Sequence, residues 1–271
     1  TKRPASSFVL TQRGLTDTNA LTMTAGESQL FEQGQVLTPN DGSILRGEKK
    51  PEIYLVQNGS LQLFSAYTFN QRKVAKNVKV VPDSEIDTYP KFGFVAPLDG
   101  TLVKSAKQNT VFYMEGGLKK PVSGPVFKNR GFKNAQVVVL SEEEVSGLPI
   151  GAFATPKERT VLKAPDGSLY LFKDGQKHLV STFVAKQRKI TADISVTTQE
   201  AGEWADGVPI PPADNTIVKG DKSQAVYIVV KSQLRPLTAV AFKARKITAK
   251  KITVLPQTEV DNYAKGDVLA K

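Results

Sequence analysis

The sequence contains no cysteine and a single histidine, His178, among its 271 residues. Disulfide bonds and thiolate metal sites are therefore excluded, and a zinc or iron site built on histidine ligands is not expected. There is no run of about 18 apolar residues that could cross a bilayer as a helix. The segment Thr1–Ser7 lacks the apolar core of a signal peptide, so an exported protein would be represented here in a mature or trimmed form.

Negative charge is in short supply, with 26 Asp and Glu against 37 Lys and Arg and a net charge of +11. This balance favours anionic partners such as acidic wall polymers, glycans, lipid headgroups or nucleic acid. The case for nucleic acid rests on charge alone, and salt-sensitive binding to duplex and single strands would test it.

A unit of about 57 residues recurs along the chain. Each copy carries an arginine at the end of a predicted short helix, and an apolar residue three positions earlier gives that helix one buried stripe. The five copies align on Arg13, Arg72, Arg130, Arg188 and Arg245. The period divides the chain into a half repeat and four full repeats, which we number 1 to 4. Their bounds are 1–40 for the half repeat, then 41–98, 99–157, 158–213 and 214–271.

The first half of each full repeat predicts a three-stranded meander. Two apolar runs flank Asn58-Gly59, Gly116-Gly117 or Asp174-Gly175, dipeptides that favour tight hairpin turns. A third run follows, and Pro121 and Pro236 within it indicate an edge strand, since proline cannot donate to an internal ladder. The second half of each repeat predicts a short helix, an alternating strand, an acidic turn and a glycine that leads into the next unit.

Residues 1–40 match only the helix–strand part of a repeat, with Ser7–Arg13 aligning on Thr182–Arg188 and a strand expected over Leu21–Met23. A half repeat leaves apolar surface and strand edges uncovered. Three explanations stay open: a longer array, a ring closed by the two ends, or strands supplied by a neighbouring chain, copies of this chain included. We favour packing of the half repeat on repeat 1.

The predicted fold class is a β-rich tandem repeat with a three-stranded meander, a short helix and a strand per unit. The units would form either a propeller-like ring of roughly four or five units or an open string of small modules. The stretch from Tyr170 to His178 resembles a blade strand of hemopexin-type propellers, which implies the ring.

Repeat 2 has the most recognisable pattern, with Val111-Phe-Tyr-Met-Glu-Gly-Gly-Leu-Lys-Lys-Pro-Val122, then Val126-Phe-Lys-Asn-Arg-Gly-Phe132 and Leu148-Pro-Ile-Gly151. This pattern resembles tandem repeats of secreted, cell-surface and wall-associated bacterial proteins, over residues 41–271. The resemblance implies an extracellular or cell-surface, non-enzymatic protein, such as a surface-layer, appendage or matrix component.

The search for chemistry leaves two sets of candidate residues and predicts neither a cofactor nor a metal site. The recurrent arginines would grip phosphate or carboxylate groups of a polymer, or make contacts between units, and their presence in every copy favours the structural role. The aromatic candidates for stacking on a glycan are Trp204, Tyr54, Tyr170 and Tyr227, although Trp204 equally fits a packing role between units. Asp41, Asp99 and Asp214 open their repeats and fit junction turns better than calcium ligands.

The sequence therefore predicts a non-enzymatic structural or adhesive surface protein. Its expected partners are copies of itself or an anionic surface polymer. The alternative is a lectin-like β-propeller that binds glycans at sites repeated between units.

Overall fold

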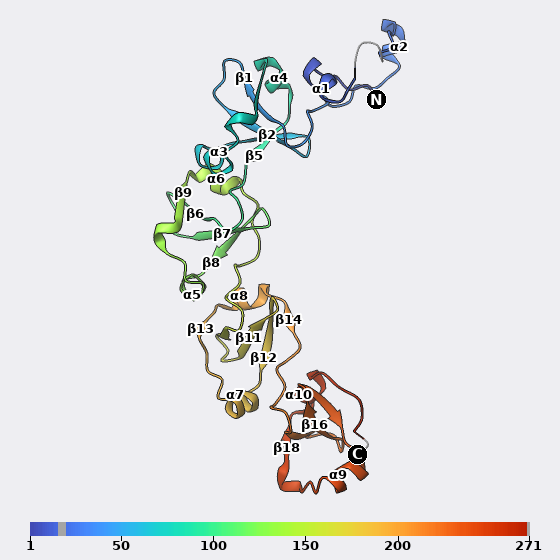
Figure 1. Cartoon of the computed structure of the whole chain (residues 1–271), viewed down its shortest axis with the longest axis vertical. Helices are drawn as coiled ribbons and strands as arrows, with labels where there is room; N and C mark the ends of the chain where they lie inside the picture. The colour runs from blue at the N-terminus through green and yellow to red at the C-terminus, as the bar shows by residue number, and fades with distance from the viewer. Residues whose placement is uncertain (16–19, 270–271) are drawn as a thin grey trace. The chain divides into compact units, whose positions relative to one another are not determined.

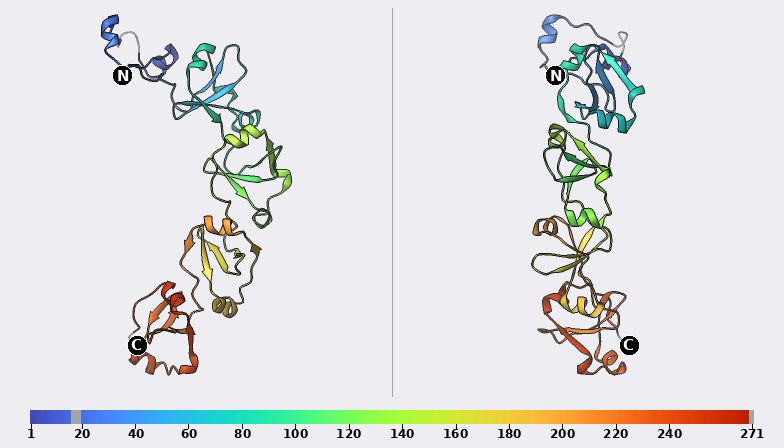
Figure 2. Two further views of the ribbon diagram at one scale, coloured as in Figure 1. Left: turned by 180° about the vertical axis from the view of Figure 1, so that it is seen from behind. Right: turned by 90° about the vertical axis from the view of Figure 1, so that its left-hand side faces the viewer.

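The computed structural model describes residues 1–15 and 20–269; residues 16–19 of the half repeat and the last two residues of repeat 4 lie outside this range. The described part of the chain is β-rich, as predicted, with four mixed sheets of four or five strands (Figure 1). Within the described residues no sheet closes on itself in any of the three views (Figures 1 and 2). The helices of this part of the chain are too short and polar to span a bilayer.

The chain divides into two compact units, the first formed by residues 1–120 and 135–151 and the second by 121–134 and 152–271. The first sheet of the first unit has the order β4-β1-β2-β3-β5. Its strands are β1 (Ile44–Gly47), β2 (Ile53–Gln57), β3 (Ser60–Leu63), β4 (Val78–Val81) and β5 (Lys91–Phe94). Strands β1 to β3 form the predicted antiparallel meander, while β4 pairs in parallel with β1 and β5 with β3. Helices α3 (Ala66–Arg72) and α4 (Asp83–Thr88) connect them.

The second sheet has the order β8-β7-β6-β9 and is accompanied by helix α6 (Glu142–Gly147). Its strands are β6 (Leu102–Ser105), β7 (Val111–Glu115), β8 (Leu118–Val122) and β9 (Val137–Leu140). Strand β9 pairs in parallel with β6, as β4 does with β1. Strand β8 lies at the edge of this sheet, where the sequence placed Pro121.

The second unit contains the other two sheets, with the orders β13-β10-β11-β12-β14 and β17-β16-β15-β18. The strands of the former are β10 (Val161–Lys163), β11 (Leu169–Lys173), β12 (Gln176–Val180), β13 (Ile194–Ser195) and β14 (Asp206–Gly207). Those of the latter are β15 (Ile217–Gly220), β16 (Val226–Val230), β17 (Gln233–Pro236) and β18 (Ile252–Leu255). The helices are α5 (Gly124–Asn129), α7 (Thr182–Arg188), α8 (Thr198–Glu203), α9 (Ala239–Ala244) and α10 (Gln257–Asn262).

One residue of the first meander strand is fully buried in every sheet and anchors its core. These residues are Leu45, Val103, Leu162 and Val218, each 0% exposed. Burial of such a side chain contributes about 1.5–3 kcal/mol, so each small sheet depends on this position.

Helix α7, which follows the meander of repeat 3, packs on the core of repeat 4. Val184 of α7 is buried in one cluster with Val218, Val229 and Val260 of repeat 4. Val9 of helix α1 (Ser7–Gln12) likewise lies in the core cluster of repeat 1, which confirms that the half repeat packs there. Serine or threonine caps both helices and the equivalent helices of the other repeats, since its hydroxyl accepts the N–H three residues on. The caps are Ser6, Ser65, Ser123, Ser181 and Thr238.

The acidic segments, expected as turns, form short helices instead. The acidic segment of the half repeat forms helix α2 (Ala25–Gln29), whose N-terminus has a capping box between Thr24 and Glu27. The strand expected over Leu21–Met23 is wrong, because residues 20–24 have no regular structure. In the full repeats the equivalent strand is held by parallel pairing with the first meander strand, and residues 1–15 and 20–40 contain no counterpart of that strand.

Candidate functional site at the junctions between repeats

Each full repeat opens with an acidic residue whose carboxylate binds the hairpin turn of the same repeat. Asp99 accepts hydrogen bonds from the backbone N–H groups of Gly116 and Gly117, at 2.9 and 3.2 Å. These bonds hold the pKa of Asp99 below its ordinary value, because they favour the charged carboxylate. The same contact joins Asp41 to Gly59, Glu158 to Asp174 and Gly175, and Asp214 to Lys231 and Ser232.

The residue before the recurrent arginine is a second junction contact. The side chain of Gln71 accepts from the N–H of Leu98 and donates to the hydroxyl of Thr101, both at 2.9 Å. It thus holds the backbone that leads into repeat 2 and the start of the meander of repeat 2. Equivalent pairs of bonds link Gln12 to Asn40 and Ser43, Asn129 to Lys157 and Thr160, and Gln187 to Ala213 and Thr216.

The recurrent arginines bind backbone carbonyls of the same linking segment. The Nη2 of Arg72 donates to the carbonyl of Ala96 at 2.8 Å. Arg13 binds the carbonyl of Thr38, Arg130 that of Thr155 and Arg188 that of Pro212. Arg245 forms the C-cap of α9. The structure thus places the guanidinium groups of Arg13, Arg72, Arg130 and Arg188 on the segments that link one repeat to the next.

At two junctions, those of the half repeat with repeat 1 and of repeat 3 with repeat 4, a serine hydroxyl also lies beside a tyrosine hydroxyl. The hydroxyls of Ser6 and Tyr89 both donate to one oxygen of Glu85, each at 2.5 Å. Burial and the neighbouring carboxylate raise the pKa of Tyr89 far above its ordinary value, because ionisation would place a second negative charge beside Glu85. Between repeats 3 and 4 the hydroxyl of Tyr263 donates to Glu259 at 2.5 Å and lies 3.5 Å from the hydroxyl of Ser181.

The tyrosines proposed for glycan stacking face lysine side chains. The ammonium nitrogen of Lys91 lies 5.7 Å from the centre of the Tyr54 ring, Lys177 lies 5.5 Å from Tyr170, and Lys265 lies 4.9 Å from Tyr227. The distances are those of cation–π contacts, which occupy one face of each ring. Stacking of these tyrosines on a glycan stays a prediction, and it would have to use the opposite face of each ring.

Trp204 also takes a packing role rather than a stacking role. Its indole is only 4% exposed and lies edge-to-face on Phe172, with ring centres 5.9 Å apart. Its Nε1 donates to the carbonyl of Phe153 at 3.1 Å, so its polar group is satisfied within the second unit.

The lysine that covers the ring comes from either of two sequence positions. In repeat 2 it is Lys119, on the third strand, and the paired position is Ile150. In repeat 4 the same pair is reversed, with Leu234 on the third strand and Lys265 opposite. Lys119 donates to a carbonyl of α6 and Lys265 to one of α10, the equivalent short helix of repeat 4, and burial lowers the pKa of both lysines. Repeats 1 and 4 share one version of this site, and repeats 2 and 3 share the other.

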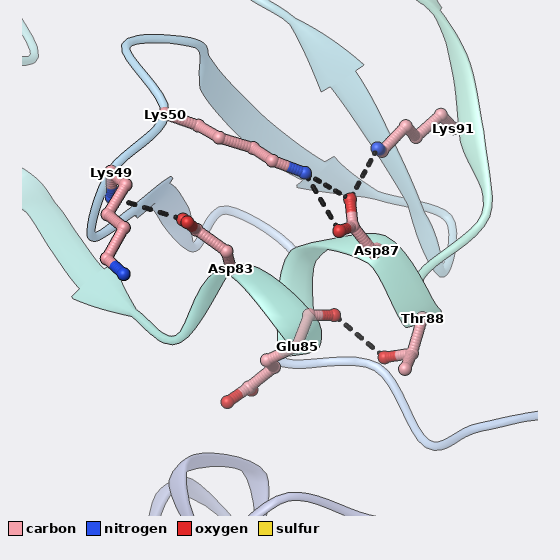
Figure 3. A network of polar contacts seen from close by, with 7 residues as sticks. All are labelled: Lys49, Lys50, Asp83, Glu85, Asp87, Thr88 and Lys91. Atoms are coloured by element: carbon pink, nitrogen blue, oxygen red, sulfur yellow. Dashed lines mark hydrogen bonds and ion pairs between the residues drawn. The ribbon is translucent and has the colours of Figure 1, made fainter.

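A network of exposed charges supports this lysine in repeat 1 (Figure 3). The carboxylate of Asp87 accepts from the ammonium of Lys50 at 2.7 and 2.8 Å and lies 3.5 Å from that of Lys91. The bond to Lys50 lowers the pKa of Asp87 and raises that of Lys50. In Figure 3 the carboxylate of Glu85 points away from this network, in keeping with its bonds to Ser6 and Tyr89.

Asp41, Asp99 and Asp214 lie in junction turns, as the sequence indicated. The glutamine or asparagine before the arginine was missed as a site residue, although it stands beside four of the five arginines. Within the described residues no three histidine, aspartate or glutamate side chains gather into a potential metal site. The arrangement as a whole binds backbone groups of the protein itself.

Comparisons with known proteins give distant likenesses. No family model matches the chain. Protein CgeD of Bacillus subtilis (strain 168) is 25% identical over 193 residues, which are 66% of this chain and 44% of that protein. The chain therefore spans less than half the length of this relative.

Two solved structures of the ESX-5 inner membrane complex are also similar, one of its periplasmic assembly and one of the intact complex. They cover 85% and 89% of this chain, and 94% and 82% of the matched chains. Both are 11% identical, with TM-scores of 0.21 and 0.20, values that support no inference about this chain.

Proposed function

We propose that this chain is a non-enzymatic structural or adhesive protein of an extracellular or cell-surface assembly, built as a tandem array of β-rich repeats. The observation that carries the proposal is the recurrent junction. Its arginine, its glutamine or asparagine and its opening acidic residue all bind backbone or hydroxyl groups of the adjoining segments. Polar residues that recur at such contacts serve to fix one repeat against the next.

The net charge of +11 supports an anionic surface polymer as the partner. Because the guanidinium groups at four junctions bind carbonyls, the attraction in our proposal comes mainly from lysines. Exposed examples are Lys79, Lys243, Lys250 and Lys251. Attraction of this kind depends on counterion release and weakens steeply with salt.

Fluorescence anisotropy with end-labelled polyphosphate of defined length tests this proposal. We expect saturable binding in low salt, with the logarithm of the affinity falling linearly as the logarithm of the NaCl concentration rises. Absence of binding in low salt, or an affinity that does not change with salt, would refute the polymer-binding role.

A further inference from the structure

Repeats 1 and 3 have a groove at the same place, between the second and third meander strands and the helix that follows them. In repeat 1 it lies between β2, β3 and α3, with a volume of about 350 Å³. In repeat 3 it lies between β11, β12 and α7, with a volume of about 510 Å³. Every residue that lines the groove of repeat 1, from Pro51 to Phe69, has its counterpart in the lining of repeat 3, from Gly167 to Ala185. The groove is therefore built into the repeat, and repeat 3 enlarges it.

The enlargement follows from the residue three positions before the recurrent arginine, which is Ala185 in repeat 3. The other full repeats have phenylalanine there: Phe69, Phe127 and Phe242. In repeat 1 the ring of Phe69 lies edge-to-face on Phe64, with ring centres 5.9 Å apart. Repeat 3 has Val180 in place of Phe64, so both rings of this pair are replaced by small side chains. Space vacated by a large side chain stays open unless its neighbours collapse into it. Here the lining of the groove extends past Ala185 to Ile190.

The walls of the groove in repeat 3 are apolar. Leu169, Ala185 and Ile190 are half-buried and pack on a cluster that includes Val180, which is 3% exposed. Leu179 forms the outer wall and is 38% exposed. Ligand pockets have volumes of about 300–1,000 Å³ and mostly apolar walls, so a group of the size of a phenyl ring would fit between these side chains.

The rim of the groove is positively charged. Lys186 and Lys189 of the α7 segment line it, both are exposed, and neither takes part in an ion pair within the described residues. The acidic residue next to the lining in sequence is Asp166, whose carboxylate accepts from the N–H and the hydroxyl of Ser168 at 2.9 and 3.0 Å. The two ammonium groups therefore favour carboxylates on whatever enters the groove.

We propose that the groove of repeat 3 binds the phenylalanine side chain of an acidic polypeptide segment. A phenyl ring is selected because three other repeats fill this place with phenylalanine from their own helix. Acidic neighbours are selected by charge complementarity with Lys186 and Lys189. A single aromatic side chain anchored in a pocket, with charges at the rim, is a common arrangement at protein interfaces. The inference goes beyond the attraction of an anionic polymer, which needs no ring.

Repeat 4 provides an internal control for charge alone. Lys243 and Lys246 stand at the positions of Lys186 and Lys189, and all four are exposed. Phe242 occupies the position of Ala185. An acidic peptide attracted only by lysines would therefore affect repeats 3 and 4 alike, whereas a peptide that inserts a ring would affect repeat 3.

A titration of the ¹⁵N-labelled chain with the blocked pentapeptide Asp-Glu-Phe-Glu-Asp tests the inference. We expect saturable shifts of the amides of Leu169, Ala185 and Ile190, with much smaller shifts at Lys243 and Lys246. Replacement of the phenylalanine of the peptide by alanine should weaken binding at least tenfold. Replacement of its four acidic residues by glutamine should weaken binding at least threefold at low salt.

The variant Ala185→Phe fills the groove with the residue that three other repeats carry, so it is expected to fold. It should bind the pentapeptide at least tenfold more weakly, whereas Ala185→Ser, the matched control, should bind within twofold of the unmodified chain. Equal affinity of Ala185→Phe and the unmodified chain would overturn the inference, as would equal affinity for the alanine peptide.

Two further outcomes would replace the proposed occupant. Shifts of the Leu169 and Ala185 amides that grow with protein concentration in the absence of peptide would assign the groove to a second copy of the chain. Binding of 3-phenylpropanoate as tightly as the pentapeptide would assign it to a small aromatic acid. The affinity for polyphosphate should be the same for Ala185→Phe and the unmodified chain, so failure of this inference and failure of the polymer-binding proposal are distinguishable.

Discussion

Removal of the Gln71 side chain should loosen the junction between repeats 1 and 2. Gln71→Ala deletes two hydrogen bonds, an exposed one from the N–H of Leu98 and a half-buried one to the hydroxyl of Thr101. Individual hydrogen bonds contribute about 0.5–1.5 kcal/mol, so together these two contribute about 1.5 kcal/mol. Alanine is the better helix former by a few tenths of a kcal/mol, so the net loss of stability is about 1 kcal/mol.

The assay is native-state amide exchange at Leu98, combined with equilibrium unfolding in urea. A local loss of about 1 kcal/mol predicts roughly fivefold faster exchange of the Leu98 amide. Gln71→Glu keeps the acceptor oxygen but loses the donor, so it should largely preserve protection at Leu98.

Asn70→Ala is the matched control, since Asn70 is an exposed neighbour on the same helix and the change also favours the helix. Its exchange at Leu98 should equal that of the unmodified chain. The reasoning fails if Gln71→Ala and Asn70→Ala affect Leu98 equally, or if neither affects it.

Three further changes test the other contacts. Asp99→Asn removes a carboxylate whose pKa is lowered in the folded state. The stability from this group is present above about pH 4 and is lost as the pH falls, so the variant's urea midpoint should change less between about pH 5 and pH 3. Lys119→Leu removes the ammonium that lies over the ring in repeat 2, and Ile150→Lys alone adds a second ammonium there. The double variant Lys119→Leu/Ile150→Lys moves the lysine to the position that it occupies in repeats 1 and 4. In a double-mutant cycle, the double variant should lose about 1 kcal/mol less unfolding free energy than the sum of the two single losses. Strictly additive losses would contradict the inference that the two positions are interchangeable. Tyr263→Phe removes a phenol whose pKa is raised by burial, a group that stabilises the fold below about pH 10 and loses this effect at higher pH. The unfolding free energy of Tyr263→Phe should therefore fall less steeply than that of the unmodified chain above about pH 10, and equal slopes would argue against the assignment.

The meanders could be predicted because their signals are local. Alternating apolar residues on either side of Asn58-Gly59 specify two strands and a hairpin, and β2 and β3 form there in the structure. The parallel pairing of β4 with β1 joins residues more than 30 positions apart, as Ile44 and Val78 show, and no local pattern encodes it.

Packing of the half repeat on repeat 1 was expected, but the period did not predict which repeat the helices of the full repeats cover. A repeat looks the same wherever its boundary is drawn, so the sequence does not show whether α7 covers repeat 3 or repeat 4. The structure decides this, since Val184 lies in the core cluster of repeat 4. The strand expected at Leu21–Met23 failed for a related reason: its pairing partner belongs to a part of the repeat that residues 1–40 lack.

The lysine site was hidden because the same ammonium comes from two positions in the sequence. Alignment places Lys119 opposite Leu234 and Ile150 opposite Lys265, so neither column shows a lysine in every repeat. Only the sheet register, which pairs the two positions across neighbouring segments, reveals the conserved contact. The lysine contacts of Tyr54, Tyr170 and Tyr227 were missed for the same reason.

The central claim is that the recurrent arginines have a structural role at the junctions and that exposed lysines attract the anionic partner. The most direct test is the affinity for labelled polyphosphate of a chain in which Arg13, Arg72 and Arg188 are replaced by lysine. The substitution keeps the net charge of +11 but changes the guanidinium groups that bind carbonyls. We predict an affinity within twofold of that of the unmodified chain, with faster amide exchange at the three junctions. A tenfold or greater loss of affinity, with unchanged exchange, would show that the arginines grip the polymer and would contradict the account.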